Sequence, residues 1–368
     1  MGYSRRVTPV DSPPASAVPF LAAAGGVPEQ LPGQLAFPGL EPGQPDEPGQ
    51  GVLPGFEELP RPACATDAGT DPELDQVVVA LRAADPDGTG LAAAIRDAFD
   101  LLLDGQHTGR YRWDQLHKTE KTHAGTLIEI GIQRRLGLAD GTTLDYSVAG
   151  AEVDCKFSHR SGGWMIPPEA EGRLLLLVQA SDETGTWSAG LVRAREEYLS
   201  QAGNRDLKRT LNDAGRGAIE WLSLDAPLPE NALLRLPERD VTAIFAWPRG
   251  QQRVNELFRR AIGRRISRAV VATVARQDDP MKRVRENGGA RDQLRGEGIV
   301  IFGDYAAHQA LASALGLPSP GAGEFVSARL TPRAEAHGTA RYVRLDGADW
   351  VVAPAGEPAG PAPRLPRV

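Results

Sequence analysis

Apolar residues between about 74 and 222 recur at two spacings, which predict helices followed by strands. The runs at 74–84 and 91–105 have helical spacing, and Gly105 suits the left-handed residue that follows a helix. A shorter amphipathic helix is expected at 126–137. Strand-like segments come next, at 143–148, 151–158, 173–180 and 186–194, and a helix around 204–222 completes the unit.

A second pattern of apolar positions begins near residue 232 and ends near 352. One apolar face predicts a helix that ends near Gln277 and is formed by Ile266, Val270, Val271 and Val274. Asp279 suits the N-cap of the next helix and Pro280 its first position. The segment at 298–302 then reads as a short strand. We therefore expect a two-domain protein of mixed α/β (α+β) class.

The remaining segments lack periodicity. Residues 1–72 hold 14 of the 30 prolines and carry a net charge of −6, so they are expected to be a disordered, Pro/Gly-rich acidic tail. The expected boundaries are a tail at 1–72, a first domain at 73–221, a linker at 222–231, a second domain at 232–352 and a loose end at 353–368.

Several classes of protein are excluded by simple counts. The longest apolar runs, at 174–178 and 269–275, are far shorter than the roughly 20 residues that a transmembrane helix needs. Cys64 and Cys155 cannot form a disulfide framework or a four-cysteine zinc site. No glycine-rich phosphate loop ending in Gly-Lys-Ser/Thr is present, which argues against ATP-driven chemistry. We expect a cytoplasmic protein without a membrane partner.

The charge of the second domain differs from that of the whole chain. Between Arg249 and Arg295 there are 13 Lys and Arg residues and five acids, a net charge of +8 over 47 residues in a chain of net charge −7. Such a segment is typical of binding to a polyanion such as DNA. The alternative is a solvated helix face.

The candidate chemistry lies in two adjacent strands of the first domain. Asp154 and Lys156 are two residues apart in a strand, so both side chains point to one face of the sheet. If Ala149 and Gly150 form a two-residue turn, Val148 opposes Ala151, and Asp145 by the same count opposes Asp154. Two carboxylates at that spacing repel each other unless a cation lies between them, and Mg²⁺ prefers such oxygen ligands.

An acid, some nine residues, and then Asp-x-Lys is the pattern of the PD-(D/E)xK nuclease superfamily. Glu129, on the preceding helix, is the kind of fourth acid that such sites often include. The alternative interpretation is a charged hairpin that faces solvent. Cys155 alternates away from Asp154 and Lys156 and should pack in the core.

A longer resemblance then becomes visible. The segments 114–130, 143–158 and 162–168 are similar to the NaeI type of restriction endonuclease. The similarity continues through 190–194, 204–209, 253–260, 268–285 and 288–303, so that it covers nearly everything from about 74 to 352.

This resemblance implies roles for individual residues. Glu129, Asp145, Asp154 and Lys156 fall on the catalytic acids and lysine of the family, with the three acids as metal ligands. The first domain would then be an endonuclease domain resembling the MutH type of nicking enzyme. The second would be a DNA-binding effector domain with a winged helix-turn-helix. Enzymes of this type IIE class are bacterial, cut GC-rich palindromes as homodimers with Mg²⁺, and are stimulated by a second DNA copy.

From these observations we expect a type II restriction endonuclease that makes Mg²⁺-dependent double-strand breaks and binds two DNA copies per protomer, one as substrate and one as effector. The expected DNA-contacting residues are Lys121, Lys282, Arg283, Arg285, Arg291 and Arg295. A nicking repair nuclease and a DNA-binding regulator with an inert nuclease domain are the alternatives.

Overall fold

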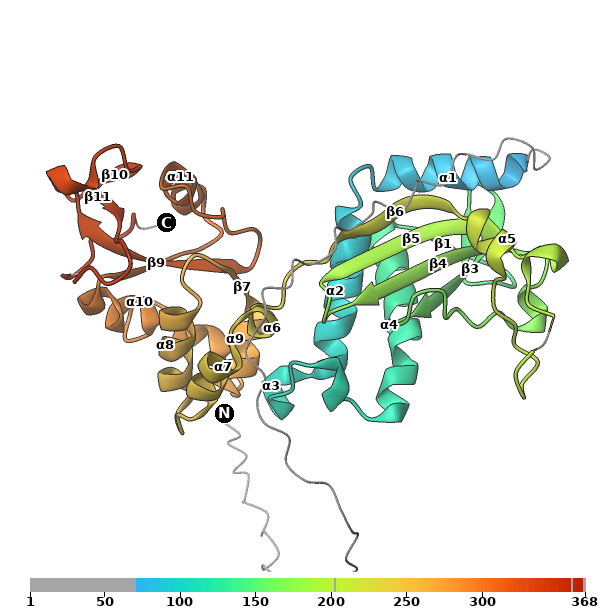
Figure 1. The fold of residues 1–368 in the computed structure, drawn as a ribbon, viewed down its shortest axis with the longest axis horizontal. Helices are drawn as coiled ribbons and strands as arrows, with labels where there is room; N and C mark the ends of the chain where they lie inside the picture. Colours follow the sequence, from blue (N-terminus) through green and yellow to red (C-terminus); the bar gives the residue numbers. More distant parts are fainter. Residues whose placement is uncertain (1–70, 202, 359, 367–368) are drawn as a thin grey trace, which may run out of the picture. The chain divides into compact units, whose positions relative to one another are not determined.

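The computed structural model describes residues 71–201, 203–358 and 360–366. The acidic tail expected at 1–72 therefore lies outside the described residues, except for Asp71 and Pro72. The described chain is of mixed α/β class and contains two separate sheets (Figure 1), as the sequence predicts.

The first sheet contains six strands in sequence order, β1-β2-β3-β4-β5-β6. Their bounds are β1 Ala139–Asp140, β2 Tyr146–Val148, β3 Ala151–Ser158, β4 Leu174–Ser181, β5 Thr186–Arg193 and β6 Glu220–Pro227. Strands β3 and β4 run parallel, and every other neighbouring pair is antiparallel. The prediction of the strands that became β3, β4 and β5 is confirmed to within one residue at each end.

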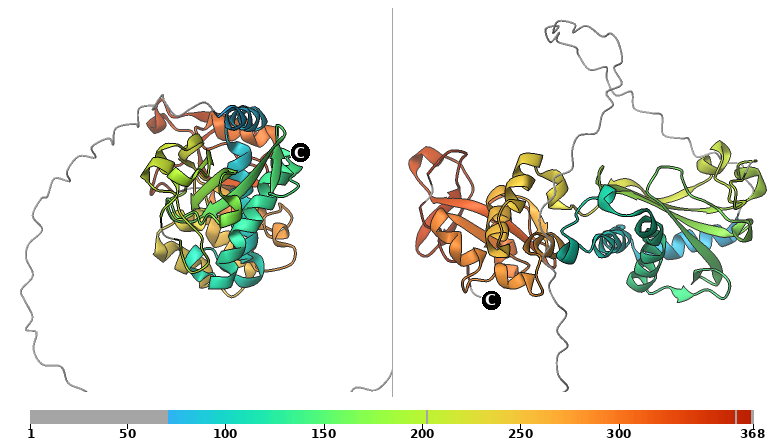
Figure 2. Two further views of the ribbon diagram at one scale, coloured as in Figure 1. Left: turned by 90° about the vertical axis from the view of Figure 1, so that its right-hand side faces the viewer. Right: turned by 90° about the horizontal axis from the view of Figure 1, so that it is seen from below.

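Helices cover one face of this sheet (Figures 1 and 2). They are α1 (Pro72–Ala84), α2 (Thr89–Leu103) and α4 (Lys118–Leu136), with a short α3 (Gly105–Thr108) after α2. Their apolar sides pack on alternate residues of the strands, because successive strand side chains point to opposite faces. The shared core includes Phe99, Ile128, Ile132, Val153, Cys155, Leu176 and Trp187. Cys155 is buried there, as its position in the alternation predicts.

A second cluster covers the opposite face of the same sheet. Leu175 and Leu177 of β4 pack there against Trp164 and Ile166, which lie in the connection from β3 to β4. The Trp164 indole N–H donates to the carbonyl of Val178 at 2.9 Å, which holds this connection on the sheet. Leu199 and Leu211, on the connection from β5 to β6, complete the cluster.

Three expected features of this domain differ in the structure, although the helix expected at 126–137 is present as part of α4. Asp104, not Gly105, adopts the left-handed conformation that ends α2. The helix expected at 126–137 begins eight residues earlier, at Lys118, because the Glu120 carboxylate accepts from the His117 N–H and caps that end. The helix expected at 204–222 is reduced to α5 (Asp213–Gly217), since the following residues pair with β5 as strand β6.

The same pairing corrects the expected linker. Residues 222–227 belong to β6, and Leu228 is buried in the core of the first sheet, so the connection to the next helix is only 228–231. β6 is an edge strand, where the missing N–H of Pro227 is tolerated.

The second sheet is built from residues after 264, following helices α6 (Ala232–Arg235), α7 (Glu238–Phe245) and α8 (Gly250–Arg260). Its strands are β7 Arg265–Ser267, β8 Ile299–Phe302, β9 Glu324–Pro332, β10 Tyr342–Leu345 and β11 Ala348–Val352. They form the order β10-β11-β9-β7, with β8 paired to β9. The strand predicted at 298–302 is confirmed as β8. Helix α9 (Arg268–Ala275) follows β7, and α11 (Ala306–Ala314) lies between β8 and β9 in the chain.

The basic helix expected after Pro280 is not an α-helix. Residues Pro280–Arg283 form a 3₁₀ turn, in which the Lys282 N–H bonds to the Asp279 carbonyl at 3.3 Å. Gly288 then turns the chain with φ of 75°, and only Ala290–Gln293 (α10) is α-helical. A nearby glycine pair leaves too few residues for a stable helix to propagate.

The loose end expected at 353–368 is also wrong for the described residues. Ala362 is 2% exposed and packs with Leu330, Val343 and Trp350 of the second sheet. Its N–H donates to the Arg295 carbonyl at 2.8 Å. Among the described residues, no helix combines the length and apolar character needed to cross a membrane.

Candidate active site

The β2–β3 hairpin places the candidate carboxylates. Ala149 and Gly150 form its two-residue turn with φ of 51° and 86°, the pair of positive values that a type I′ turn requires. Val148 opposes Ala151 and Tyr146 opposes Val153, so the predicted register is confirmed. Asp145 lies one step beyond the last paired residue of β2, on the side of the hairpin where Asp154 follows Val153.

A backbone hydrogen bond fixes the Asp145 side chain. Its Oδ2 accepts from the Cys155 N–H at 2.7 Å. The carboxylate of Asp145 is therefore held against strand β3 between the two residues of the Asp-x-Lys pattern, even though the ladder of β2 begins only at Tyr146.

Asp154 and Lys156 form a close ion pair on β3. The distance from Lys156 Nζ to Asp154 Oδ2 is 2.5 Å, and Nζ also donates to the Cys155 carbonyl at 3.3 Å. Asp154 is only 7% exposed. Burial raises the pKa of its carboxyl, the Lys156 charge opposes that rise, and Asp145 adds to it.

Glu129 approaches the pair from helix α4. Its side chain is partly buried, and burial is the main cause of a raised pKa. The Asp145 charge raises this pKa further, and Lys156 opposes it. The Tyr146 hydroxyl donates to the Glu129 carbonyl at 2.8 Å, which ties α4 to β2. The structure thus brings all four predicted residues into one electrostatic cluster.

These residues suit a hard cation by their chemistry. Asp154 Oδ2 is buried, and among the described residues the Lys156 ammonium at 2.5 Å is the donor that approaches it. Buried carboxylates with raised pKa values gain from a divalent ion with oxygen ligands. As placed, however, no three His, Cys, Asp or Glu side chains in the described part of the chain are close enough to enclose a metal. Asp145, which is held at the Cys155 N–H, and the adjacent Asp154 are the pair that could hold one.

The predicted DNA-contacting residues do not form one surface. Lys282 and Arg285 both have side chains that are 62% exposed, beside Asp279 at 3.4 and 4.0 Å. Arg283 is turned aside, because its Nε donates to Gln277 Oε1 at 2.9 Å. Lys121 lies on α4, in the first domain, where its charge helps lower the pKa of His159.

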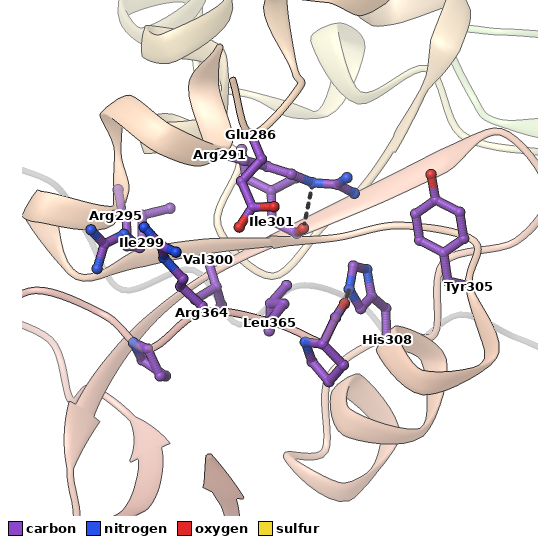
Figure 3. Close-up of a pocket in the computed structure, with 12 residues that line it drawn as sticks. Glu286, Arg291, Arg295, Ile299, Val300, Ile301, Tyr305, His308, Arg364 and Leu365 are labelled. Atoms are coloured by element: carbon purple, nitrogen blue, oxygen red, sulfur yellow. Dashed lines mark hydrogen bonds between the residues drawn. The ribbon is translucent and has the colours of Figure 1, made fainter. Parts of the chain in front are cut away.

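Arg291 and Arg295 instead line a cavity of about 300 Å³ beneath the C-terminal segment (Figure 3). Arg291 is partly buried; its Nε donates to the Ile301 carbonyl at 3.1 Å, and burial lowers its pKa. Arg295 Nη1 donates to the Ala362 carbonyl at 3.5 Å. The sequence pattern could not separate these two arginines from Lys282 and Arg285, because all four belong to one basic run.

Acids outside that run neutralise several of its other charges. Arg259 pairs with Glu297 at 2.7 Å, Arg260 with Asp240 at 2.5 Å and Arg264 with Glu230 at 3.1 Å. The net charge of +8 therefore overstates the positive charge available to a ligand.

Trp113 and His159 form a contact near this site that sequence reasoning did not find. Their rings stack with centroids 4.3 Å apart and an angle of 8° between planes. His159 comes directly after β3. Its Nε2 is buried and has no hydrogen-bond partner in the part of the chain that the structure describes, and burial lowers its pKa. The two residues are far apart in the chain, and no local pattern marks their stacking.

Comparison with known proteins identifies the family to which the chain belongs. The family described as "Restriction endonuclease NaeI" matches residues 75–361. The "Type II restriction enzyme NaeI" of Lentzea aerocolonigenes is 48% identical over 307 residues, which cover 82% of this chain and 96% of that protein. The match includes both sheets and all four clustered residues.

Proposed function

Because this chain belongs to the NaeI family of restriction endonucleases, we propose that it uses the Asp145, Asp154 and Lys156 cluster to cut both strands of a short, GC-rich palindromic DNA site. The chain is a type II restriction enzyme, a site-specific deoxyribonuclease. The observation that carries the assignment of the site is the close packing of Asp145, Asp154 and Lys156 at one hairpin.

The proposed roles follow from the position of each group. Asp145 and Asp154 would hold Mg²⁺, with Glu129 supporting the ion or the water around it. When bound, the metal supplies positive charge to the scissile phosphate and the leaving oxygen. Lys156 is partly exposed beside Asp154, so its ammonium can orient an attacking water and stabilise the hydroxide that forms as this water gives its proton to the surrounding solvent. The products would carry a 5′-phosphate and a 3′-hydroxyl.

The proposed domains are an endonuclease domain of PD-(D/E)xK, MutH-like type over 73–227 and a winged-helix effector domain from 232 onward. The element order α8, β7, α9, Pro280–Gln293, β8 and β9 supports the second assignment, since it places a basic segment after a turn and before two antiparallel strands. In this assignment the 3₁₀ turn at Pro280–Arg283 takes the place of the N-terminal part of the recognition helix. The wing would be formed by β8 and β9, with α11 between them in the chain.

We further propose that the enzyme acts as a homodimer and that each protomer binds a second DNA copy as activator. The support is the presence of an exposed basic pair, Lys282 and Arg285, in a domain other than that of the catalytic cluster. A monomeric nicking enzyme would need no such second site, and a regulator with an inert nuclease domain would not need four intact catalytic residues.

The test begins with plasmid DNA, Mg²⁺ and the wild-type protein. Sequencing of the ends should show one recurring palindrome with both strands cut, whereas a single nick per site would favour the repair nuclease. Asp154→Asn should abolish cleavage and leave DNA affinity nearly unchanged, since phosphate contacts elsewhere supply most of the affinity. Cleavage by this variant at a rate near wild type would show that the catalytic site lies elsewhere.

A further inference from the structure

The connection from β5 to α5 forms a loop that extends from the first sheet (Figure 1), and Leu207 lies in this loop. Leu207 is 70% exposed and has φ of 60°. This left-handed conformation is tolerated by glycine, asparagine and aspartate but is costly for a bulky side chain such as leucine. Burial in a core is therefore not what holds Leu207 in place. Strain and exposure together at a loop tip point to a function.

The loop is built to keep this shape. The Asn204 side-chain oxygen accepts from the N–H groups of Asp206 and Lys208, both at 2.9 Å. The Leu207 N–H donates to the Asn204 carbonyl and the Asn204 N–H to the Lys208 carbonyl, also at 2.9 Å. Gly203 leaves no room for a side chain, because a Cβ there would lie 3.0 Å from the Leu207 carbonyl. The tip is thus fixed by four hydrogen bonds.

Arg205 and Lys208 lie on either side of the exposed leucine, and the exposed Asp206 lies between Arg205 and Leu207. Arg205 and Lys208 are both exposed, and within the described residues neither forms an ion pair. Two of the acids at the base of the loop are paired, since Arg209 contacts Glu196 at 3.0 Å and Glu171 at 3.3 Å. An apolar tip between two free cations suits the sugar-phosphate backbone on either side of a groove.

The base of the loop lies on the sheet face that carries the catalytic pair. In the parallel β3–β4 pair, Asp154 is the register partner of Leu175, and Lys156 is the partner of Leu177. These four side chains therefore share one face of the sheet. Leu175 and Leu177 pack against Leu199 and Leu211, which are the residues just outside the loop. Arg209 also exchanges two 2.8 Å backbone hydrogen bonds with Ile166, in the connection that follows β3.

We infer that Leu207 is a wedge that enters the DNA substrate between two stacked base pairs while Arg205 and Lys208 grip the adjoining phosphates. Proteins that bend DNA insert leucine and similar side chains in this way, and the cost of unstacking is offset by the additional contacts that the bent duplex makes. The backbone strain fits this role, because it aims the side chain outward before DNA arrives. Leu207 is a positioning residue, since it does not touch the reacting phosphate.

The experiment uses duplexes that contain the mapped cleavage site, with 2-aminopurine placed at one position at a time through the site and its flanks. Fluorescence of this base increases when it loses its stacking partner. Without divalent cation, wild-type protein should increase the signal at one base step. Leu207→Ala should abolish that increase and weaken binding about tenfold, while Leu207→Met, which keeps an apolar side chain, should retain both.

Leu224→Ala is the matched control, because Leu224 is 57% exposed on β6 and should change neither quantity. A mismatch at the responding step lowers the cost of unstacking, so it should restore cleavage by Leu207→Ala to within about twofold of wild type on the same duplex. If Leu207 only stabilised its loop, a mismatch in the DNA would not restore cleavage by Leu207→Ala.

Three results would overturn the wedge. They are the absence of any fluorescence change with wild-type protein, an unchanged response in Leu207→Ala, and a loss of self-association in Leu207→Ala with normal unstacking. None of them would affect the assignment of Asp145 and Asp154, because cleavage of the plasmid is measured independently.

Discussion

Glu152 and Asp154 lie two positions apart on β3, yet their carboxyl groups respond to the fold in opposite ways. Glu152 accepts backbone hydrogen bonds from Thr142, Thr143 and Leu144, which lower its pKa. Asp154 is buried, and its pKa is raised. At the residue scale, the ionised form of Glu152 stabilises the hairpin, whereas the ionised form of Asp154 is disfavoured by its burial.

This difference predicts opposite effects of neutral substitutions on stability. The raised pKa of Asp154 means that ionisation costs stability above that pKa, so Asp154→Asn should raise the Tm at pH 8. The gain should disappear as the pH falls below the ordinary Asp value of 3.8, where both folded and unfolded chains are protonated. Thermal unfolding of both proteins between pH 3 and 8 measures the gap.

Glu152→Gln is the matched variant and should have the opposite sign. Its lowered pKa means that the anion stabilises the fold above the ordinary value of 4.5, so the variant should lose stability at pH 8. The difference from wild type should shrink as the pH falls. Equal effects of the two substitutions at pH 8 would contradict the assigned environments.

The hairpin turn is the informative case at the scale of elements. Ala149 is held at φ of 51°, where an L-residue with a Cβ is strained, and asparagine tolerates this region far better. Ala149→Asn should therefore stabilise the protein by roughly 0.5–1 kcal/mol and leave the cleavage rate unchanged. Gly150→Ala, at φ of 86°, should destabilise it. Chemical denaturation with a cleavage assay on each variant measures both quantities.

Helix α1 allows a second prediction at this scale. Asp71 caps the helix by accepting from the Leu74 N–H at 3.1 Å and contacts Arg193 at 2.6 Å, which lowers the pKa of Asp71 to about 2. Glu73 contacts the same arginine at 2.7 Å. Removal of residues 1–70 keeps these contacts and should leave the Tm and Mg²⁺-dependent cleavage nearly unchanged.

Removal of residues 1–73 is the comparison. It deletes the cap and both partners of Arg193, so stability should fall by roughly 1–2 kcal/mol. The part due to Asp71 should be full above pH 3.8 and disappear as the pH falls towards 2, since the folded pKa is lowered. If removal of 1–70 alone caused a comparable fall in Tm, the tail would have to pack on the folded domain.

At the scale of the whole molecule, the proposal of two DNA sites makes a kinetic prediction. Replacement of Lys282, Arg283 and Arg285 together by alanine should weaken DNA binding and flatten its dependence on salt, because fewer counterions are released. Slow cleavage should remain, since the catalytic cluster is intact. Stimulation by an added short cognate duplex should be lost, because coupling requires the second site to be occupied.

The cleavage rate is then measured against added cognate duplex for wild type and the triple variant. Arg259→Ala with Arg264→Ala is a suitable control, because those arginines are already paired with Glu297 and Glu230. A wild-type rate that only declines as duplex is added would rule out activation by a second copy and leave a single-site nuclease.

The sequence by itself determined the β2–β3 hairpin and its register. Alternation along 151–158, a two-residue turn and the short separation of Asp145 from Asp154 are local features, and local geometry sets the register of a tight hairpin. The buried strands β4 and β5 were also evident, because each is a short run of β-branched, aromatic and apolar residues between turn signals. Cys155 followed from the same alternation.

Tertiary structure decided the features that depend on distant partners. β6 is a strand because β5 offers an edge, and Ala362 is buried because the second sheet has an uncovered apolar face. Burial of Arg291 and the approach of Glu129 to Asp145 likewise depend on elements that are separate in the chain. Propensity and periodicity report on neighbours within a few residues, whereas burial and electrostatic environment arise only when separate elements pack together.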